Sequence, residues 1–278
     1  MTASNEIIKL IGVSCTSGSN YLLNNISWTI DRGDQWVVFG RNGCGKTTLL
    51  SIIAGYKNFS SGKLEVFGTN YAENNILQIR KRFGWISSSF FDNYYSNESV
   101  LSIVLSGLYG TLGLGYQLPT NKEIIRAMNL LDHLGIKKKH KLPFNMLSKG
   151  ERQNVLIARA FITSPEILIL DEPGTGLDVL ARENLLHLIR ELSNNRKMTT
   201  IYVTHYPEEI LPSFNKCLLL HNGTIYKVGS TKELMNSDVM SAFLNTPVSV
   251  LKTGDRYLFS INRSGNEGSE QYEHDFWL

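Results

Sequence analysis

The chain has 278 residues, of which 42% are hydrophobic and 19% charged, a balance that suits a globular protein with a sizeable core. Its formal net charge of +3 is too small to indicate a nucleic-acid or lipid partner. Nucleic acid remains a possible partner that the charge does not favour. Three scattered cysteines and the lack of a secretory signal at the N-terminus favour a cytoplasmic protein with reduced thiols.

The N-terminal part is predicted to form short strands and one helix. Three strands are expected over residues 7–13, 26–30 and 36–39. Apolar side chains with helical spacing over residues 49–53 then stop at Gly55, and alternation over residues 64–66 predicts a further strand. These elements indicate an antiparallel β portion near the N-terminus.

Residues from about 74 to 144 are predicted to be mainly helical. Within them, residues 99–121 carry no charged side chain and are about long enough to span a bilayer. Four glycines and several Ser and Thr residues interrupt this stretch, which disfavours a membrane span. We expect a short amphipathic helix that runs into a Gly-rich loop.

The second half of the chain has the pattern of an α/β protein. Residues 167–170 are all apolar, as expected of a strand buried on both faces of a parallel sheet. A helix over residues 177–194 and a strand over residues 199–204 follow, and two more strands are predicted to flank Asn222 and Gly223. Residues 247–278 are expected to form a C-terminal extension.

That extension contains one predicted strand over residues 257–261. The acidic tail after it is rich in Gly, Ser and Glu, a composition typical of disorder.

Residues 40–47 fit the phosphate-loop pattern G-x-x-x-x-G-K-S/T between a predicted strand and a predicted helix, which is the context that this pattern requires. Its glycines let backbone N–H groups surround phosphate oxygens, Lys46 reaches the β and γ phosphates, and the Thr47 hydroxyl serves Mg²⁺. The alternative is a Gly-rich structural turn, which the flanking elements disfavour. The predicted ATP-binding residues of this loop are Gly40, Arg41, Asn42, Gly43, Cys44, Gly45, Lys46, Thr47 and Thr48.

Two carboxylates follow the buried strand over residues 167–170, at the edge of the sheet where ligands bind in open α/β folds. Asp171 would hold Mg²⁺ or its water, and Glu172 would orient and deprotonate the water that attacks the γ phosphate. The alternative is a solvated strand end before the turn at Pro173. The neighbouring phosphate loop makes that alternative less favourable.

Between these motifs, residues 147–153 (LSKGERQ) resemble the signature of ATP-binding cassette (ABC) ATPases. Residues 176–178 resemble the D-loop of that family, and His205, at a strand end, resembles its switch histidine. The likeness covers roughly residues 5–235. It implies a P-loop NTPase fold with a mixed central sheet and an inserted, mainly helical subdomain.

The resemblance also implies how the chain is organised. A nucleotide-binding domain would span residues 1–246, with the helical subdomain at about residues 88–160. In the family, the signature of one subunit closes on the γ phosphate held by the phosphate loop of another, so a second ABC domain is expected, as a homodimer. Ser148 and Gly150 precede a predicted apolar helix, whose N-terminus suits an anion, and Ser148 also suits the N-cap of that helix.

The roles that the resemblance implies are those of an ATPase that uses ATP and Mg²⁺. Lys46, Glu172 and His205 would be catalytic, and Thr47 and Asp171 would hold the metal. Across the dimer, the nucleotide would be contacted by Ser148, Lys149, Gly150, Glu151 and Asp178.

Several positions depart from the family pattern. Ser88 stands where a Gln usually reaches Mg²⁺ after a strand resembling residues 83–86, so it is the candidate third metal residue. Lys149 and Glu151 replace a common Gly and Gln. Tyr21 is the nearest candidate for the aromatic that stacks on adenine, and an ordinary strand residue is an equal alternative. Together, Ser88, the Ser-x-Gly-Glu of residues 148–151 and the Gly-Leu-Asp of residues 176–178 resemble a branch associated with molybdate transport or photorepair, whose members often carry two cassettes.

The functional expectation is the ATP-binding subunit of an ABC transporter, which hydrolyses ATP in a head-to-tail dimer. A separate transmembrane permease would be its partner, and the chain would lie in the cytoplasm or peripherally on the inner face of the cell membrane. Two alternatives stay open. One is a non-transport ABC ATPase that clamps nucleic acid, a ribosome or a protein, and the other is a module that holds ATP without turning it over.

Overall fold

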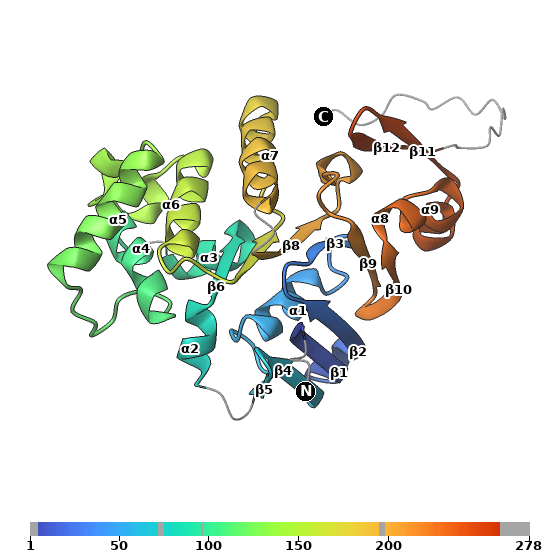
Figure 1. Cartoon of the computed structure of the whole chain (residues 1–278), viewed down its shortest axis with the longest axis horizontal. Coiled ribbons are helices and arrows are strands. Elements are labelled where there is room, and N and C mark those ends of the chain that lie inside the picture. The colour runs from blue at the N-terminus through green and yellow to red at the C-terminus, as the bar shows by residue number, and fades with distance from the viewer. Residues whose placement is uncertain (1–4, 72–74, 96, 195–197, 262–278) are drawn as a thin grey trace, which may run out of the picture.

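The computed structural model describes residues 5–71, 75–95, 97–194 and 198–261, and only the backbone of residues 88, 93 and 192–194. Figure 1 shows a central sheet with a small β layer below it, a group of helices on one side and a C-terminal hairpin on the other. The predicted acidic tail lies outside the described residues.

The N-terminal strands form a four-stranded antiparallel sheet in the order β2-β1-β4-β5. Its strands are β1 (Glu6–Ser17), β2 (Asn20–Asp31), β4 (Ser61–Val66) and β5 (Thr69–Asn70). Leu10 pairs with both Trp28 and Leu64, and all three side chains are buried. The predicted antiparallel portion is therefore confirmed, with β1 and β2 longer than their apolar segments.

The central sheet has six strands in the order β10-β9-β3-β8-β7-β6. They are β3 (Gln35–Phe39), β6 (Phe83–Ser87), β7 (Ile167–Asp171), β8 (Thr199–Thr204), β9 (Lys216–His221) and β10 (Thr224–Ser230). All pairs are parallel except β9 with β10, so the predicted mixed α/β sheet is confirmed.

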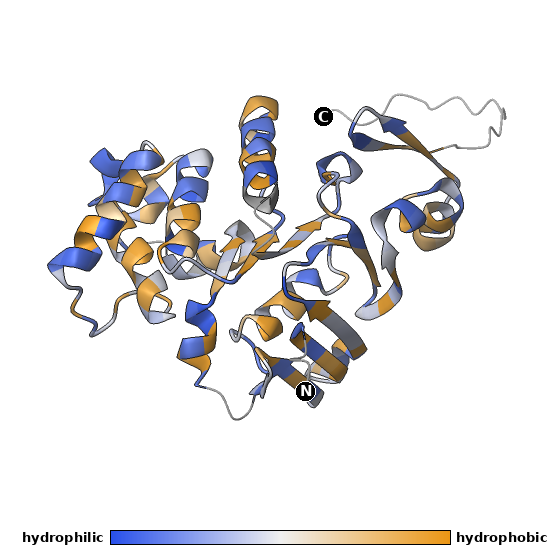
Figure 2. Cartoon of the chain, in the orientation of Figure 1, coloured by the Kyte–Doolittle hydropathy of each residue, from blue (hydrophilic) through white to orange (hydrophobic). Residues whose placement is uncertain are grey.

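The parallel strands position the site. Every residue of β3, β6, β7 and β8 is buried. The apolar stretches of β7 and β8 are orange in Figure 2. Their carboxyl ends, which meet at one edge of the sheet, are Phe39, Ser87, Asp171 and Thr204. Ligands bind at this edge in open α/β folds.

The helices are α1 (Lys46–Ile53), α2 (Ile76–Lys81), α3 (Ser88–Tyr95), α4 (Val100–Tyr109), α5 (Asn121–His133), α6 (Lys149–Phe161) and α7 (Val179–Asn194), with 3₁₀ turns η2 (Lys137–Lys139) and η3 (Phe144–Met146). Helices α3 to α6 gather beside β6 and correspond to the predicted helical subdomain (Figure 1). The uncharged stretch forms α4, which ends at Gly110 in the left-handed conformation. No helix within the described ranges is long and apolar enough to cross a membrane.

The C-terminal part begins with η4 (Pro207–Glu209) and, after β9 and β10, continues with α8 (Thr231–Leu234) and α9 (Ser237–Leu244). A hairpin of β11 (Val248–Thr253) and β12 (Arg256–Ile261) follows. Sequence reasoning expected only the second of these strands. The hairpin packs against η4, because Arg256 Nη1 donates a hydrogen bond of 2.8 Å to the Glu208 carbonyl.

Candidate functional site

The phosphate loop joins β3 to α1. Gly45 precedes α1 at φ 106° and, lacking a side chain, leaves the first N–H groups of the helix uncapped. A Cβ at this position would lie 2.9 Å from the Leu22 carbonyl oxygen, so only glycine fits. The helix therefore presents free N–H groups and its positive end toward an anion.

Lys46 is held in place by oxygen atoms at the edge of the sheet. Its side chain is 4% exposed, and its Nζ donates to the carbonyl oxygens of Gly40 at 2.8 Å and Arg41 at 3.0 Å. Nζ also forms an ion pair of 3.0 Å with Glu172 Oε1. Phosphate oxygens reaching this ammonium would compete with these three oxygens.

Asp171 is the buried acid of the site. Its Oδ2 accepts hydrogen bonds of 2.9 Å from the Thr47 and Ser87 hydroxyls, while its buried Oδ1 accepts none from the described residues. Burial raises the pKa of Asp171 to about 6 against the lowering effect of these two hydrogen bonds. An orphaned carboxylate oxygen beside two hydroxyls fits Mg²⁺, which prefers oxygen ligands and few carboxylates.

Glu172 and His205 face each other across the same edge. Glu172 has a φ of 49°, an uncommon backbone conformation for a side-chain-bearing residue, and its N–H donates to the Val203 carbonyl at 3.0 Å. Its Oε1 lies 3.2 Å from His205 Nδ1. Glu172 is 25% exposed and His205 20% exposed, so both are within reach of a water molecule.

A cavity of about 460 Å³ lies over the phosphate loop. It is lined by Tyr21, Leu22, Asn42, Gly43, Gly45, Lys46, Thr47, Thr48, Ser89, Glu172, Asn222 and Gly223. Tyr21 belongs to β2 and is 62% exposed, and it lines this cavity together with Lys46. Its position fits a base-stacking side chain, which stays a prediction.

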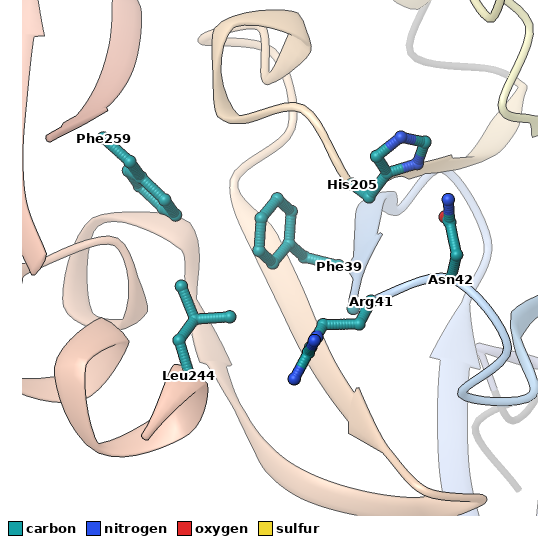
Figure 3. A pocket seen from close by; sticks show the side chains of 7 residues that line it. Phe39, Arg41, Asn42, His205, Leu244 and Phe259 are labelled. Carbon is teal, nitrogen blue, oxygen red and sulfur yellow. The ribbon is translucent and has the colours of Figure 1, made fainter. Parts of the chain in front are cut away.

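A second cavity, of about 380 Å³, lies on the other side of the loop. Figure 3 shows Phe259 and Leu244 from the C-terminal part facing Phe39 and Arg41, with His205 on a further wall. Asn42 lines both cavities. The phosphate loop thus lines two cavities, and Phe259 of the C-terminal hairpin lines the second of them.

The signature residues are not part of these two cavities. Ser148 caps α6 in a reciprocal capping box with Glu151, whose Oε1 also pairs with Lys139 Nζ at 2.5 Å. Ser148, Gly150 and Glu151 line a third cavity, of about 430 Å³, together with residues of α7. Within one chain, the structure therefore brings Ser148 close to α7 and not to Lys46.

The D-loop residues lie beside the signature. Asp178 Oδ1 accepts a hydrogen bond of 2.8 Å from the Ala181 N–H. The Lys149 ammonium lies against Gly176, whose φ is 73° and where a Cβ would collide with it. Signature and D-loop thus form one surface, and Ser148, Lys149 and Gly150 are exposed on it.

Ser87 was not among the predicted site residues. The side chain of Ser88, the predicted metal residue, lies outside the described part of the chain, so that assignment stays a prediction. Ser87 is fully buried, and its hydroxyl donates to Asp171. The pairing of β6 with β7 places Ser87 opposite Asp171. A polar residue at the end of β6 could therefore have indicated this contact.

A phosphate loop, an acidic strand end and a mixed sheet at whose edge they meet define a P-loop nucleotide-binding protein. The sequence profile of the ABC transporter family matches residues 23–175, more than half of the chain. The chain belongs to this family, and it is the ATP-binding subunit of an ABC transporter.

The relatives cover nearly the whole chain. An uncharacterised ABC transporter ATP-binding protein, YlmA of Bacillus subtilis, is 39% identical over 90% of this chain and 95% of its own length. The molybdate import ATP-binding protein MolC of Haemophilus influenzae is 32% identical over 82% of this chain and 84% of its own. The resemblance to a branch that includes molybdate ATP-binding proteins is thereby confirmed.

A solved structure shows the same fold. CbiO1 from Clostridium perfringens, part of the CbiONQ transporter complex, has a TM-score of 0.66 at 26% identity and covers 87% of this chain and 95% of its own.

Proposed function

We propose that this chain hydrolyses ATP with Mg²⁺ at a site that two copies complete, and that it powers a separate membrane-spanning permease. The observation that carries the proposal is the position of Glu172 Oε1, 3.0 Å from Lys46 Nζ and 3.2 Å from His205 Nδ1, on the wall of the cavity over the phosphate loop. A carboxylate that can position a water molecule and a cation that can bind phosphate are groups that phosphoryl transfer to water uses, and the imidazole beside them can add to the stabilisation of charge.

Lys46 would exchange the Gly40 and Arg41 carbonyls and the Glu172 carboxylate for the β and γ phosphates of ATP. The released Glu172 carboxylate would orient a water molecule and accept its proton. His205, on the other side of Glu172, would stabilise the γ phosphate as charge develops on it. Thr47 and Asp171, with Ser87 behind them, would hold Mg²⁺, which neutralises charge on the phosphates.

The second copy follows from the position of the signature. Ser148 and Gly150 are exposed at the N-terminus of α6 and line a cavity other than the one over the phosphate loop. The Ser148 hydroxyl, the Gly150 N–H and the helix dipole suit a phosphate that this chain does not itself hold there, whereas the Ser148 N–H already donates to Glu151. A head-to-tail pair would place them over the γ phosphate of the neighbour.

The permease is the part of the proposal that distinguishes a transporter from a nucleic-acid clamp. The chain would lie on the inner face of the cell membrane. When it is tagged and purified from its native membranes, it is expected to bring an integral membrane protein with it. Salt-sensitive binding to DNA or RNA in the presence of ATP, without such a protein, would favour the clamp instead.

Glu172→Gln tests hydrolysis and pairing together. The variant keeps an acceptor oxygen but loses the base, so we expect phosphate release to fall at least about a hundredfold while ATP is still bound. Size-exclusion chromatography should then give a dimer with ATP and a monomer with ADP. Glu191→Gln, at a carboxylate that is 65% exposed on α7, is the matched control and should behave as wild type. Unchanged phosphate release in Glu172→Gln would refute the proposed role of this residue.

A further inference from the structure

Glu209 is a buried carboxylate on η4, the 3₁₀ turn that follows β8 and His205. Its side chain is 1% exposed. Its Oε2 accepts a hydrogen bond of 2.6 Å from the Thr204 hydroxyl and one of 3.0 Å from the Tyr202 hydroxyl. Thr204 is the last residue of β8 and precedes His205, so this oxygen holds the end of that strand.

The other oxygen faces two different segments. Oε1 is buried and accepts no hydrogen bond from the described residues. Arg182 Nε, on α7, lies 3.7 Å away and is also buried without a hydrogen bond there. On its other side, Oε1 packs so close to Gly174 that a Cβ at this glycine would collide with it.

Each of these contacts is next to a residue of the nucleotide site. Gly174 lies in the turn after Glu172, in which the Thr175 N–H donates to the Glu172 carbonyl at 3.1 Å. Arg182 lies in the first turn of α7, where its N–H donates to the Asp178 carbonyl at 2.9 Å. One carboxylate therefore touches the segments that carry His205, Glu172 and Asp178.

Burial of a carboxylate is unfavourable unless hydrogen bonds and a nearby opposite charge compensate for its lost hydration. Burial raises the pKa of Glu209, and the Thr204 and Tyr202 hydroxyls and Arg182 oppose that effect. A neutral side chain of similar size would fill the same space at a lower cost in desolvation. The carboxylate thus has a use other than packing.

We propose that Glu209 is a positioning residue of the ATPase site: it fixes the Glu172 and His205 segments relative to each other and, through Arg182, ties them to the D-loop. It touches no reacting atom. The inference rests on the proposed function, since the geometry that Glu209 sets is that of the hydrolytic pair. Loss of its charge should slow the chemical step and leave ATP binding intact.

Glu209→Gln is the direct test, since the amide still accepts hydrogen bonds from Thr204 and Tyr202 but lacks the charge that attracts Arg182. We expect kcat for phosphate release to fall about tenfold or more, with the KM for ATP and the Kd for a fluorescent ATP analogue within about twofold of wild type. Glu208→Gln is the matched control: Glu208 is the neighbouring residue on η4, is 39% exposed, and lies 3.9 Å from Arg182 Nη1. It should keep kcat within about twofold.

Arg182→Met provides a second route, because it leaves the hydrogen bonds of Glu209 in place. It should lower kcat in the same way, and the double variant with Glu209→Gln should be no slower than the slower single variant, since both remove one interaction. If Glu209→Gln does not fold, Arg182→Met alone decides the question.

A purely structural role predicts a different result. Glu209→Gln would then lower Tm but keep the wild-type kcat at temperatures well below Tm, and this outcome overturns the inference. A wild-type kcat for phosphate release in the Arg182→Met variant overturns it as well. If the wild-type chain releases no phosphate above the level of Glu172→Gln, the proposed function fails first, and the inference fails with it.

Discussion

Lys46 Nζ and Glu172 Oε1 form an ion pair of 3.0 Å between the first residue of α1 and the residue after β7. The pair joins the group proposed to bind phosphate to the group proposed to activate water. Because Lys46 also donates to two backbone carbonyls, its ammonium has three oxygen partners before any nucleotide arrives. In the proposed mechanism, ATP displaces these contacts and so frees the Glu172 carboxylate.

Lys46→Ala should lower the affinity for ATP about tenfold or more. The variant loses charge-assisted hydrogen bonds to phosphate, which contribute about 1.5–3 kcal/mol each, and 1.4 kcal/mol corresponds to a factor of ten. Isothermal titration with ATP measures the change. Lys57→Ala, at an exposed lysine after the same helix, should bind ATP as the wild type does. Equal affinities of the two variants would contradict the assigned role of Lys46.

Ser87→Ala should raise the Mg²⁺ concentration needed for half-maximal phosphate release several-fold. The Ser87 hydroxyl is one of two that hold Asp171 Oδ2, so its loss leaves a buried carboxylate less well oriented. A Mg²⁺ titration at saturating ATP gives the measurement. Ser102→Ala, which removes a hydroxyl bonded to Glu98 in the helical part, is the control. An unchanged Mg²⁺ requirement in Ser87→Ala would rule out this contribution.

Tyr21→Ala should raise the KM for ATP about tenfold, whereas Tyr21→Phe should leave it unchanged. A base stacked on an aromatic ring contributes about 1–3 kcal/mol, and the ring rather than the hydroxyl provides it. Tyr226→Ala, at a tyrosine of β10 that is 45% exposed, serves as the control. If Tyr21→Phe weakens binding as much as Tyr21→Ala, the side chain does not act by stacking.

Glu166 is predicted to stabilise the fold at neutral pH. It lies between Arg82 Nε at 2.5 Å and Arg32 Nη1 at 2.7 Å, and the hydrogen bond from Arg82 is the largest cause that lowers its pKa. A lowered pKa means that the stabilisation is complete above the unfolded-state pKa and is lost as the pH falls through the folded-state value.

Glu166→Gln should therefore unfold at a lower urea concentration at pH 7, by about 1 kcal/mol or less because the pair is one-third exposed. The difference from wild type should shrink as the pH is lowered below the ordinary carboxyl range. A difference that grows on acidification would contradict this sign.

The parts of the fold that sequence reasoning predicts are those with continuous apolar patterns. β7 and β8 are buried along their whole length, as expected of strands whose side chains on both faces can lie in the core. β11 lacks such a pattern: Val248 is its one fully buried residue, and the strand forms because β12 and α9 lie beside it. Ser241 on α9 accepts a hydrogen bond from the Val248 N–H, a contact that no local pattern indicates.

The site shows the same division. Lys46, Thr47, Asp171 and Glu172 follow from motif and strand order, and the structure brings them to one edge of the sheet. Three consecutive serines begin at the last residue of β6, and the sequence alone does not tell which hydroxyl meets Asp171, since the register of β6 against β7 decides it. Glu209, in a Pro-Glu-Glu turn, has the sequence of a solvated loop and is buried only because Gly174 and Arg182 close over it.

Complementation of two inactive variants tests most directly whether the site is shared between two copies. Lys46→Ala disables the phosphate loop in one variant, and Ser148→Arg blocks the signature in the other variant. In a head-to-tail dimer, a mixed pair holds one intact site, so an equal mixture should recover about a quarter of the wild-type phosphate release. If the mixture stays as inactive as the separate variants although each folds and pairs with the other, each chain hydrolyses ATP with its own residues or not at all, and the account of a shared site is wrong.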